Sequence, residues 1–352
     1  MVSGKAGGQR RRAPTVDVDG VVLLDKPEGL SSNAALQRAR RSFSAAKAGH
    51  TGTLDPMASG LLPVCLGDAT KFSQGLLDAD KGYLATALLG VATDTGDREG
   101  KVVAQRPVDA TAAQVVAALA SLTGPLEQVP PMYSALKHQG QPLYAIARAG
   151  GDVARAPRAV VIHALDLVEW DNPRLTFSVS CSKGTYVRTL AEQIAERLGT
   201  VAHLISLRRT TVGPFTLGSS VTLAALEAAE SPQRPQYLRP ADTLVESLPA
   251  VTLCTSDALG LLQGRALQPC PAASAALPAD GDPPVLVRLY GPSRLPGLRG
   301  AAGSDRAFLG VGAVESGPDG AARVRPMRLI AHAASHAADE NDAIRPPLGE
   351  RA

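Results

Sequence analysis

The sequence predicts an α+β protein with a large N-terminal domain and a smaller, β-rich C-terminal domain. A buried strand at 20–25 precedes residues at helical spacing, among them Leu36 and Ala39. The segment 175–182 alternates strictly between apolar and polar residues, which is typical of a strand in a sheet with one polar face. After Leu248, short β-type pieces are separated by loops rich in Pro, Gly and Ala. At 352 residues the chain is long enough for two domains.

The other elements of the large domain follow from turn signals and apolar periodicity. Ser31 and Ser32 are typical of a helix start after the turn at 27–29. The Gly-rich segment 48–60 has neither a helical nor an alternating period, so we expect a structured loop. The later patterns predict a strand at 81–89, a helix from 111 to 122, a chain break at 130–131, strands at 160–168 and 175–182, and helices at 185–198 and 222–229.

Composition shifts divide the chain into four segments. The proline-dense stretch 231–235 is typical of a connection between domains. We therefore expect a flexible basic segment at 1–18, the large domain at 19–245, the small β-rich domain at 246–330 and a disordered tail at 331–352.

Composition and charge exclude several classes of protein. With 45% hydrophobic and 20% charged residues, the chain can form a normal packed interior, which excludes wholesale disorder. The longest apolar runs, such as 60–66, are far shorter than the roughly 20 residues that cross a bilayer. The basic N-terminus is followed by Pro14 rather than by the apolar core of a signal peptide. We therefore expect a cytoplasmic protein without a membrane span.

Cysteine and histidine spacing does not predict a metal site. The four cysteines lie far apart in sequence without a CxxC pair, so neither a disulfide scaffold nor a zinc cage is indicated. His332 and His336 are spaced for one helix face, but two ligands in an Ala-rich tail are too few. The net charge of +3 is also too small to identify a nucleic-acid-binding protein by itself.

Asp55 is the most informative single residue. It lies between Leu54 and Pro56 in a loop whose glycines allow a close approach of the backbone. A carboxylate in such an apolar loop needs a partner, because burying an unpaired charge is costly. The simpler interpretation is an aspartate that caps a turn or a helix. The segment alone leaves both interpretations open.

The segment around Asp55, GHTGTLDPMASGLLP at 49–63, closely resembles the active-site signature of the bacterial tRNA pseudouridine synthases that modify the T-loop uridine, the TruB family. Further motifs agree in the family's order; they are DKPEG at 25–29, KGY at 81–83, PPMYSALK at 130–137, CSKGTYVRT at 181–189 and LRR at 207–209. The departures, at Thr53, Met57 and Ser59, replace no functional group. The resemblance covers about 19–215 densely and implies a catalytic domain around a mixed, largely antiparallel sheet. It also implies a small PUA-like RNA-binding domain after it.

The resemblance implies conversion of uridine to pseudouridine at position 55 of the T-loop in tRNA, without cofactor or metal. The catalytic residues would be Asp55 as the essential carboxylate, Arg188 as its partner, Tyr83 as the stacking platform for the base, and Tyr186 as the group that handles the proton on C5. Taken alone, each has a structural alternative: Arg188 as a surface helix arginine and Tyr83 as a core residue.

The resemblance also implies residues that bind substrate. His50 would fill the space left by the flipped base, Leu207 would line the base pocket, and Lys26 would shape the floor beside the loop. Gly52, Lys137 and Arg208 complete this set. His50 and Leu207 could instead be structural, and a basic run such as the one on the first helix is often a solvated face. Candidates for phosphate contacts are Arg38, Arg40, Arg41, Lys47, Lys137, Arg148, Arg208 and Arg209.

The expected partner is tRNA, which the chain would bind at the T-arm. If the C-terminal domain contacts RNA, we expect it to bind the acceptor stem as well. We expect a monomer. The alternative function is a non-catalytic protein that binds tRNA or assists its folding with the same fold. A glycosidase-like hydrolase would need a second positioned carboxylate, and no matching Glu accompanies Asp55.

Overall fold

The computed structural model describes residues 18–270, 273, 277, 284–294, 304–317 and 320–330. The chain forms two compact units. The first contains Val22–Gly67 and Leu76–Tyr237, and the second contains Asp19–Val21, Asp68–Gly75 and the described residues from Leu238 onward. The domain boundaries drawn from the sequence stay a prediction. Residues 1–17 and 331–352, with His332 and His336, lie outside the described residues.

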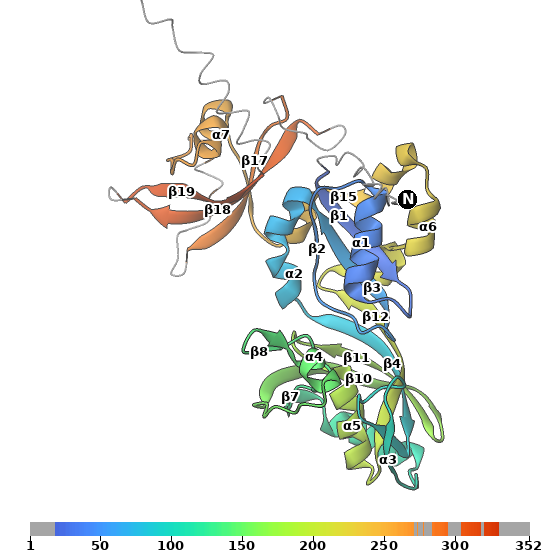
Figure 1. Ribbon diagram of the computed structural model, residues 1–352. Helices are drawn as coiled ribbons and strands as arrows, with labels where there is room; N and C mark the ends of the chain where they lie inside the picture. Colours follow the sequence, from blue (N-terminus) through green and yellow to red (C-terminus); the bar gives the residue numbers. More distant parts are fainter. Residues whose placement is uncertain are drawn as a thin grey trace, which may run out of the picture. The chain divides into compact units, whose positions relative to one another are not determined.

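The first unit is built on one mixed sheet with the strand order β14–β1–β3–β12–β4–β11–β10–β7 (Figure 1). Its strands are β1 (Gly20–Lys26), β2 (Ala48–His50), β3 (Ser59–Leu66), β4 (Lys81–Leu89), β7 (Gly124–Gln128), β10 (Arg158–Asp171), β11 (Arg174–Cys181), β12 (Ala202–Val212), β13 (Phe215–Thr216) and β14 (Val221–Thr222). Most pairs are antiparallel, whereas β1–β14 and β3–β12 are parallel. The predicted α+β class, with a mixed and largely antiparallel sheet, is confirmed.

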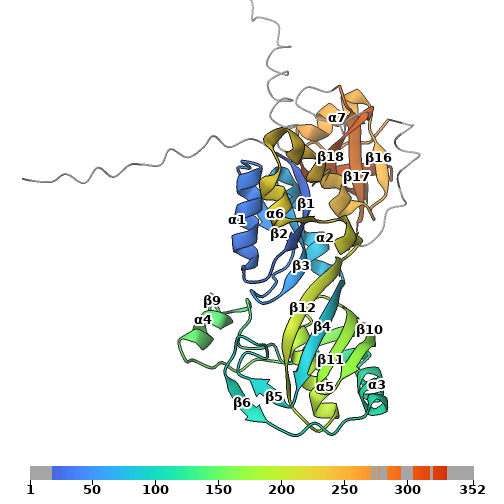
Figure 2. The same ribbon diagram turned by 90° about the vertical axis from the view of Figure 1, so that its right-hand side faces the viewer.

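Helices cover this sheet at its two ends. Figure 2 shows α1 (Ser32–Ser42) beside α6 (Leu223–Ala228), and the two helices pack together. At the other end, α3 (Ala112–Ser121) packs on β10, and α5 (Val187–Arg197) packs on β12. The Ser31 hydroxyl caps α1, and Thr111 caps α3 in a capping box with Gln114. The remaining elements are α2 (Gln74–Asp78), α4 (Leu143–Arg148) and the hairpins β5 (Val91–Thr93)–β6 (Val102–Gln105) and β8 (Lys137–His138)–β9 (Gln141–Pro142).

The loop expected at 48–60 is shorter in the structure, because strands form at both of its ends. β2 pairs antiparallel with β3, so that His50 lies opposite Val64. All residues of β3 except Ser59 are buried. A strand buried on both faces shows no alternation of apolar and polar residues, which explains why periodicity did not reveal it. Only 51–58 remain as the loop that carries Asp55.

The second unit has a sheet of β16 (Ala250–Thr252), β17 (Val285–Pro292), β18 (Arg306–Ser316) and β19 (Ala322–Leu329) in that order. β15 (Leu238–Arg239) precedes them. Helix α7 (Thr255–Leu262), which the β-type texture did not predict, packs on β17 and β19. Its buried Ala258, Leu261 and Leu262 join the apolar core of this sheet. The segment 231–235, expected to be a connection, lies in a 3₁₀ helix at Ser231–Tyr237.

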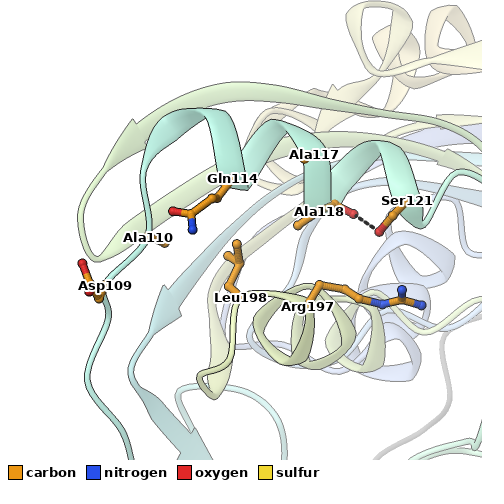
Figure 3. A pocket seen from close by; sticks show the side chains of 8 residues that line it. All are labelled: Asp109, Ala110, Gln114, Ala117, Ala118, Ser121, Arg197 and Leu198. Carbon is orange, nitrogen blue, oxygen red and sulfur yellow. Dashed lines mark hydrogen bonds between the residues drawn. The ribbon is translucent and has the colours of Figure 1, made fainter.

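A cavity of about 320 Å³ opens between α3 and the end of α5 (Figure 3). Asp109 and Gln114 line it on one side, and Arg197 and Leu198 line it on the other. None of the residues singled out from the sequence lines this cavity. Among the described residues, no helix combines the length and apolar character needed to span a membrane.

Candidate active site

The loop that carries Asp55 is held by hydrogen bonds to the backbone on both sides of this residue. The buried Ser32 hydroxyl accepts a hydrogen bond from Leu54 N at 2.7 Å and donates one to Leu54 O at 3.0 Å. Gly29 N donates to Pro56 O at 2.8 Å. Leu54, Met57 and Ala58 bury their side chains, whereas the Asp55 side chain remains 33% exposed. The backbone beside Asp55 is therefore held in place, and its carboxylate remains partly accessible to solvent.

Arg188 lies directly against this carboxylate. Its Nε is 3.0 Å from Asp55 Oδ2, and its side chain is only 4% exposed. The two terminal nitrogens donate to backbone carbonyls, Nη1 to Thr95 O and Nη2 to Tyr133 O, both at 2.7 Å. A guanidinium held at three points offers Asp55 a cation in one fixed orientation. The surface-helix alternative for Arg188 is therefore excluded.

Asp97 is a residue of this cluster that the sequence analysis missed. It is 5% exposed, and its Oδ2 is 3.7 Å from Arg188 Nη1. Its Oδ1 accepts from the Thr95 hydroxyl at 2.6 Å and from Glu99 N at 3.0 Å. The available signal was the polar turn at 94–97, an acid-rich stretch with a glycine just after β5.

The charges around Asp55 act in opposite directions on its pKa. Burial raises the pKa of the Asp55 carboxyl above its ordinary value of 3.8, while Arg188 opposes this shift and Asp97 adds to it. Lys26 also lowers the pKa of Asp55, but less than Arg188 does. Burial in turn lowers the pKa of Lys26 to about 8. Its ammonium donates to Leu30 O at 2.6 Å and to Pro27 O at 2.9 Å, so it is oriented by the turn after β1.

Tyr83, Leu207 and Arg209 lie on one face of the sheet. In the β12–β4 register, Tyr83 lies opposite Arg209, and Leu207 lies opposite Ala85. Residues opposite one another share a face, and so do residues two apart along a strand. Burial raises the pKa of the half-buried Tyr83 hydroxyl, and Arg209 opposes that shift. Leu207 itself is 5% exposed, so it lies mainly in the core.

Arg209 was expected to contact phosphate, and the structure corrects this. It is 1% exposed; its Nε donates to Leu61 O at 2.7 Å and its Nη2 to Gly52 O at 3.2 Å. Its backbone passes so close to Gly60 that a Cβ there would overlap the Arg209 carbonyl, and Gly60 has φ +104°. Arg209 therefore supports the loop from beneath.

His50 and Tyr186 lie at the edges of this group. His50 ends β2; its Nδ1 is buried and has no hydrogen-bond partner among the described residues. Burial, with Arg209, lowers the pKa of His50, so the neutral ring is favoured. Tyr186 is the N-cap of α5, and its backbone N donates to Gln128 Oε1 at 2.9 Å. Burial raises the pKa of the Tyr186 hydroxyl.

Other predicted binding residues are not brought to Asp55. Arg208 donates from both terminal nitrogens to Asp25, at 2.7 and 3.2 Å, and from Nη1 to Ser59 Oγ at 3.2 Å. Arg38 is paired with Glu227. Lys137 is exposed on β8, and among the described residues no hydrogen bond or ion pair joins it to the cluster.

Comparison with known proteins adds independent observations. Residues 40–187 match the model of the TruB family pseudouridylate synthase N-terminal domain, and 188–246 match that of the tRNA pseudouridylate synthase B C-terminal domain. The tRNA pseudouridine synthase B of Aromatoleum aromaticum is 52% identical over 94% of this chain and 98% of its own length. The enzyme of the same name from Ralstonia nicotianae is 49% identical over 92% and 97%.

The fold is also found among solved structures. A chain in a crystal structure of a Cbf5–Nop10–Gar1 complex superposes with a TM-score of 0.62 and 25% identity, covering 88% of this chain and 84% of that one. With relatives this similar over nearly their full length, and with both family models matched in order, this chain belongs to the TruB family of pseudouridylate synthases.

Proposed function

We propose that this chain isomerises uridine to pseudouridine at position 55 in the T-loop of tRNA, with Asp55 as the essential carboxylate. The observation that carries the proposal is the 3.0 Å contact between Asp55 Oδ2 and Arg188 Nε in a rigid, partly open loop. The reaction detaches uracil from C1′ and rejoins it through C5, without redox change. It therefore needs an ionised, positioned oxygen and a pocket for the base, and it needs no cofactor.

Burial favours the protonated form of Asp55, and Arg188 opposes this shift by favouring the ionised form. An ionised carboxylate at this place can act at C1′, at C6 of uracil or on a ribose proton, and all three routes use the same residues. Arg188 is already fixed by the carbonyls of Thr95 and Tyr133, so little reorganisation is needed during the reaction.

The base must leave the T-loop stack before it can react, at a cost of a few kcal/mol. We propose that Tyr83 stacks on the flipped uracil, which contributes about 1–3 kcal/mol. Leu207, on the same face of the sheet, closes the apolar side of the pocket. His50, whose Nδ1 has no hydrogen-bond partner within the described part of the chain and whose neutral ring is favoured, occupies the space that the base leaves. Gly52 allows the RNA backbone to approach at φ +110°.

We assign proton transfer from C5 to the Tyr186 hydroxyl, since Tyr186 immediately precedes the helix that holds Arg188. Lys26, with its pKa of about 8, adds positive charge beside the loop.

We propose that exposed basic residues such as Lys137 and Arg148 bind phosphates of the T-arm, and that the second unit is a PUA-like RNA-binding domain that contacts the acceptor stem. Arg208 contributes to substrate binding mainly by keeping Ser59 and Asp25 in place. The enzyme acts as a cytoplasmic monomer.

The test compares wild type with Asp55→Asn and Tyr83→Phe on an unmodified tRNA transcript, with pseudouridine detected by carbodiimide-dependent stops in primer extension. We expect a stop at position 55 with wild type, none with Asp55→Asn, and only a modest change with Tyr83→Phe, because the ring remains. A transcript with cytidine at position 55 is the substrate control. Undiminished product from Asp55→Asn would refute the proposal. Tight binding without product from wild type would indicate the folding-assistance alternative.

A further inference from the structure

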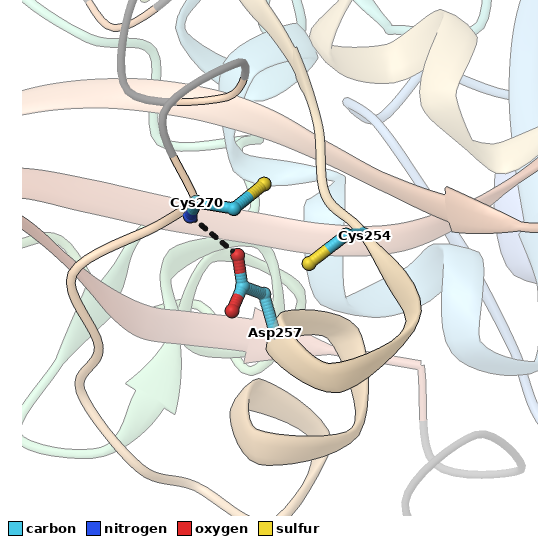
Figure 4. A group of neighbouring side chains, drawn as sticks. All are labelled: Cys254, Asp257 and Cys270. Carbon is cyan, nitrogen blue, oxygen red and sulfur yellow. Dashed lines mark hydrogen bonds between the residues drawn. The ribbon is translucent and has the colours of Figure 1, made fainter.

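The second unit brings together two cysteines that are far apart in sequence. Sγ of Cys254, Sγ of Cys270 and a carboxylate oxygen of Asp257 all lie within 4.8 Å of one another. Figure 4 shows the three side chains converging on one space. All three residues are half-buried, so a solvent ion can reach them. The other two cysteines, Cys65 and Cys181, are fully buried in the first unit.

The backbone on both sides of this cluster is anchored to the sheet. Leu253 N, just before Cys254, donates to Tyr290 O on β17 at 2.8 Å. Leu267, three residues before Cys270, exchanges two hydrogen bonds with Val324 on β19, at 2.8 and 3.1 Å. The two thiols are therefore presented by fixed segments, which lowers the cost of organising them around a ligand.

The Asp257 carboxylate is oriented in the same way. Its Oδ2 accepts a hydrogen bond from Cys270 N at 2.7 Å, as Figure 4 shows, which leaves Oδ1 for a cation. Carboxylate ligands in metal sites are commonly held by such a backbone contact. Cys254 lies at the N-cap of α7 without forming a side-chain cap, so its sulfur is not used by the helix backbone.

The spacing fits a shared cation better than a disulfide. Ligands of tetrahedral Zn²⁺, with Zn–S of about 2.3 Å, lie roughly 3.8 Å apart, so the donors need to move by only about 1 Å. A disulfide requires sulfurs at about 2.05 Å and makes no use of the charge of the Asp257 carboxylate. Two thiolates and one carboxylate select a borderline or soft cation such as Zn²⁺ over Mg²⁺ or Ca²⁺.

We propose that Cys254, Asp257 and Cys270 form a zinc site in the second unit, with solvent as the fourth ligand. Binding of Zn²⁺ to the two thiols releases up to two protons to solvent, and no oxidation state changes. The ion would join the start of α7 to the segment that follows Leu267, and would stabilise this unit independently of the reaction at Asp55. The sequence spacing predicted no such site, because only the folded sheet brings the thiols together.

The experiment uses the full chain, freed of metal by a chelator and kept reduced with a phosphine under anaerobic conditions. Titration with Co²⁺ reports the site by a sulfur-to-cobalt charge-transfer band in the near ultraviolet, and Zn²⁺ should abolish that band with a stoichiometry of one ion per chain. We expect Zn²⁺ to raise the melting temperature of the protein, because only the folded chain presents the three ligands together. Mg²⁺ should neither abolish the Co²⁺ band nor raise the melting temperature.

Variants distinguish binding at the proposed site from binding of the metal by other residues of the chain. Cys254→Ser/Cys270→Ser should lose the charge-transfer band and the zinc-dependent shift in melting temperature. Asp257→Asn keeps an acceptor for Cys270 N but loses a charged direct ligand, so it should weaken Zn²⁺ binding at least about 10-fold, the smallest loss seen for residues outside the coordination shell. His332→Ala/His336→Ala is the matched control and should bind as wild type does. Circular dichroism confirms that each variant is folded.

Two results would overturn the proposal. One is a reduced wild-type chain that takes up neither Co²⁺ nor Zn²⁺. The other is uptake that persists unchanged in the folded double cysteine variant.

Discussion

Two aspartate–arginine pairs in the first unit are built in opposite ways. Asp25 receives both terminal nitrogens of Arg208, and here the acid is the more buried partner, at 18% exposure against 37%. Asp55 contacts the buried Arg188 through one oxygen, and here the cation is buried at 4% while the acid reaches solvent at 33%. Among the described residues, no hydrogen bond reaches Asp55 Oδ1.

This difference distinguishes a pair that holds the fold from a pair that is available for chemistry. A carboxylate bound at both oxygens by a planar fork is held in one orientation and has no oxygen without a partner. A carboxylate bound at one oxygen, by a guanidinium whose other nitrogens already bind carbonyls, has its ionised form favoured by that cation and keeps its other oxygen available. We therefore expect the same two residue types to serve stability at Asp25 and the proposed catalysis at Asp55.

The largest expected effect separates the two acids by activity. Asp55→Asn should lower kcat at least about 10⁴-fold, as removal of an essential catalytic group does, whereas Asp25→Asn should lower it less than about tenfold. Release of tritium from C5-labelled uridine in tRNA under multiple turnover measures kcat for both variants. An equal loss of kcat in the two variants would contradict the proposal that only the Asp55–Arg188 pair takes part in the reaction.

The next effect concerns the two arginines. Arg188→Lys keeps a positive charge but cannot reach Asp55, Thr95 O and Tyr133 O together, so we expect kcat to fall about 100-fold with little change in the Kd for tRNA. Arg208→Lys is the matched control and should change kcat less than about fivefold. Filter binding measures the Kd for tRNA, and tritium release under multiple turnover measures kcat. A large loss of tRNA binding in Arg188→Lys would assign this arginine to the RNA backbone instead.

A smaller effect is expected on stability, and it concerns the Asp25–Arg208 pair rather than the Asp55–Arg188 pair. Asp25→Asn breaks a partly buried bidentate pair and should lower the free energy of unfolding by about 1 kcal/mol. Urea denaturation followed by circular dichroism measures it, with Glu28→Gln as the control because the Glu28–Arg98 pair is exposed. A control that loses as much stability as Asp25→Asn would contradict this reading of the Asp25 pair.

The smallest effect is a shift along the pH axis. Activity should rise with pH through the pKa of Asp55, which burial places above 3.8. Since Lys26 lowers that pKa, Lys26→Met should move the acid limb to higher pH by less than about one unit, and Lys137→Met should not move it. Single-turnover rates across the acid limb supply the test. A limb that moves to lower pH in Lys26→Met would show that the ammonium does not act on Asp55.

The raised pKa of Asp55 also affects stability. The folded state holds the Asp55 proton more tightly than the unfolded state does, so stability relative to Asp55→Asn should fall as pH rises from about 4 through the raised pKa. Urea denaturation at several pH values measures this difference. A relative stability that rises over the same range would contradict the direction of the shift.

Local patterns predicted most of the elements that carry the site. The alternation at 175–182 and the apolar stripe at 185–198 led to β11 and α5 within two residues of their observed ends. Such signals are local, because they depend only on which face of one element is buried. The TruB-like motifs added the identity of Asp55 and Arg188, which spacing alone could not pair across more than 130 residues.

What the sequence did not predict depends on contacts between distant segments. Arg208 and Arg209 are chemically identical neighbours, and only the burial of one face of β12 decides which of them supports the loop. Asp97 joins Arg188 through a turn far from α5 in sequence. β3 escaped detection because burial on both faces removes its period.

The alternating geometry of β12 has a consequence for how this strand can vary. Arg208 and Arg209 reach opposite sides of the sheet solely because they are adjacent. Inserting a single residue upstream of Leu207 would place Leu207 where Arg208 now faces Asp25, so Asp25 would lose its fork. Deleting one would place Thr210 where Arg209 now lies, so the carbonyls of Gly52 and Leu61 would lose their donor. β12 should therefore accept many changes of side chain but almost no change of length.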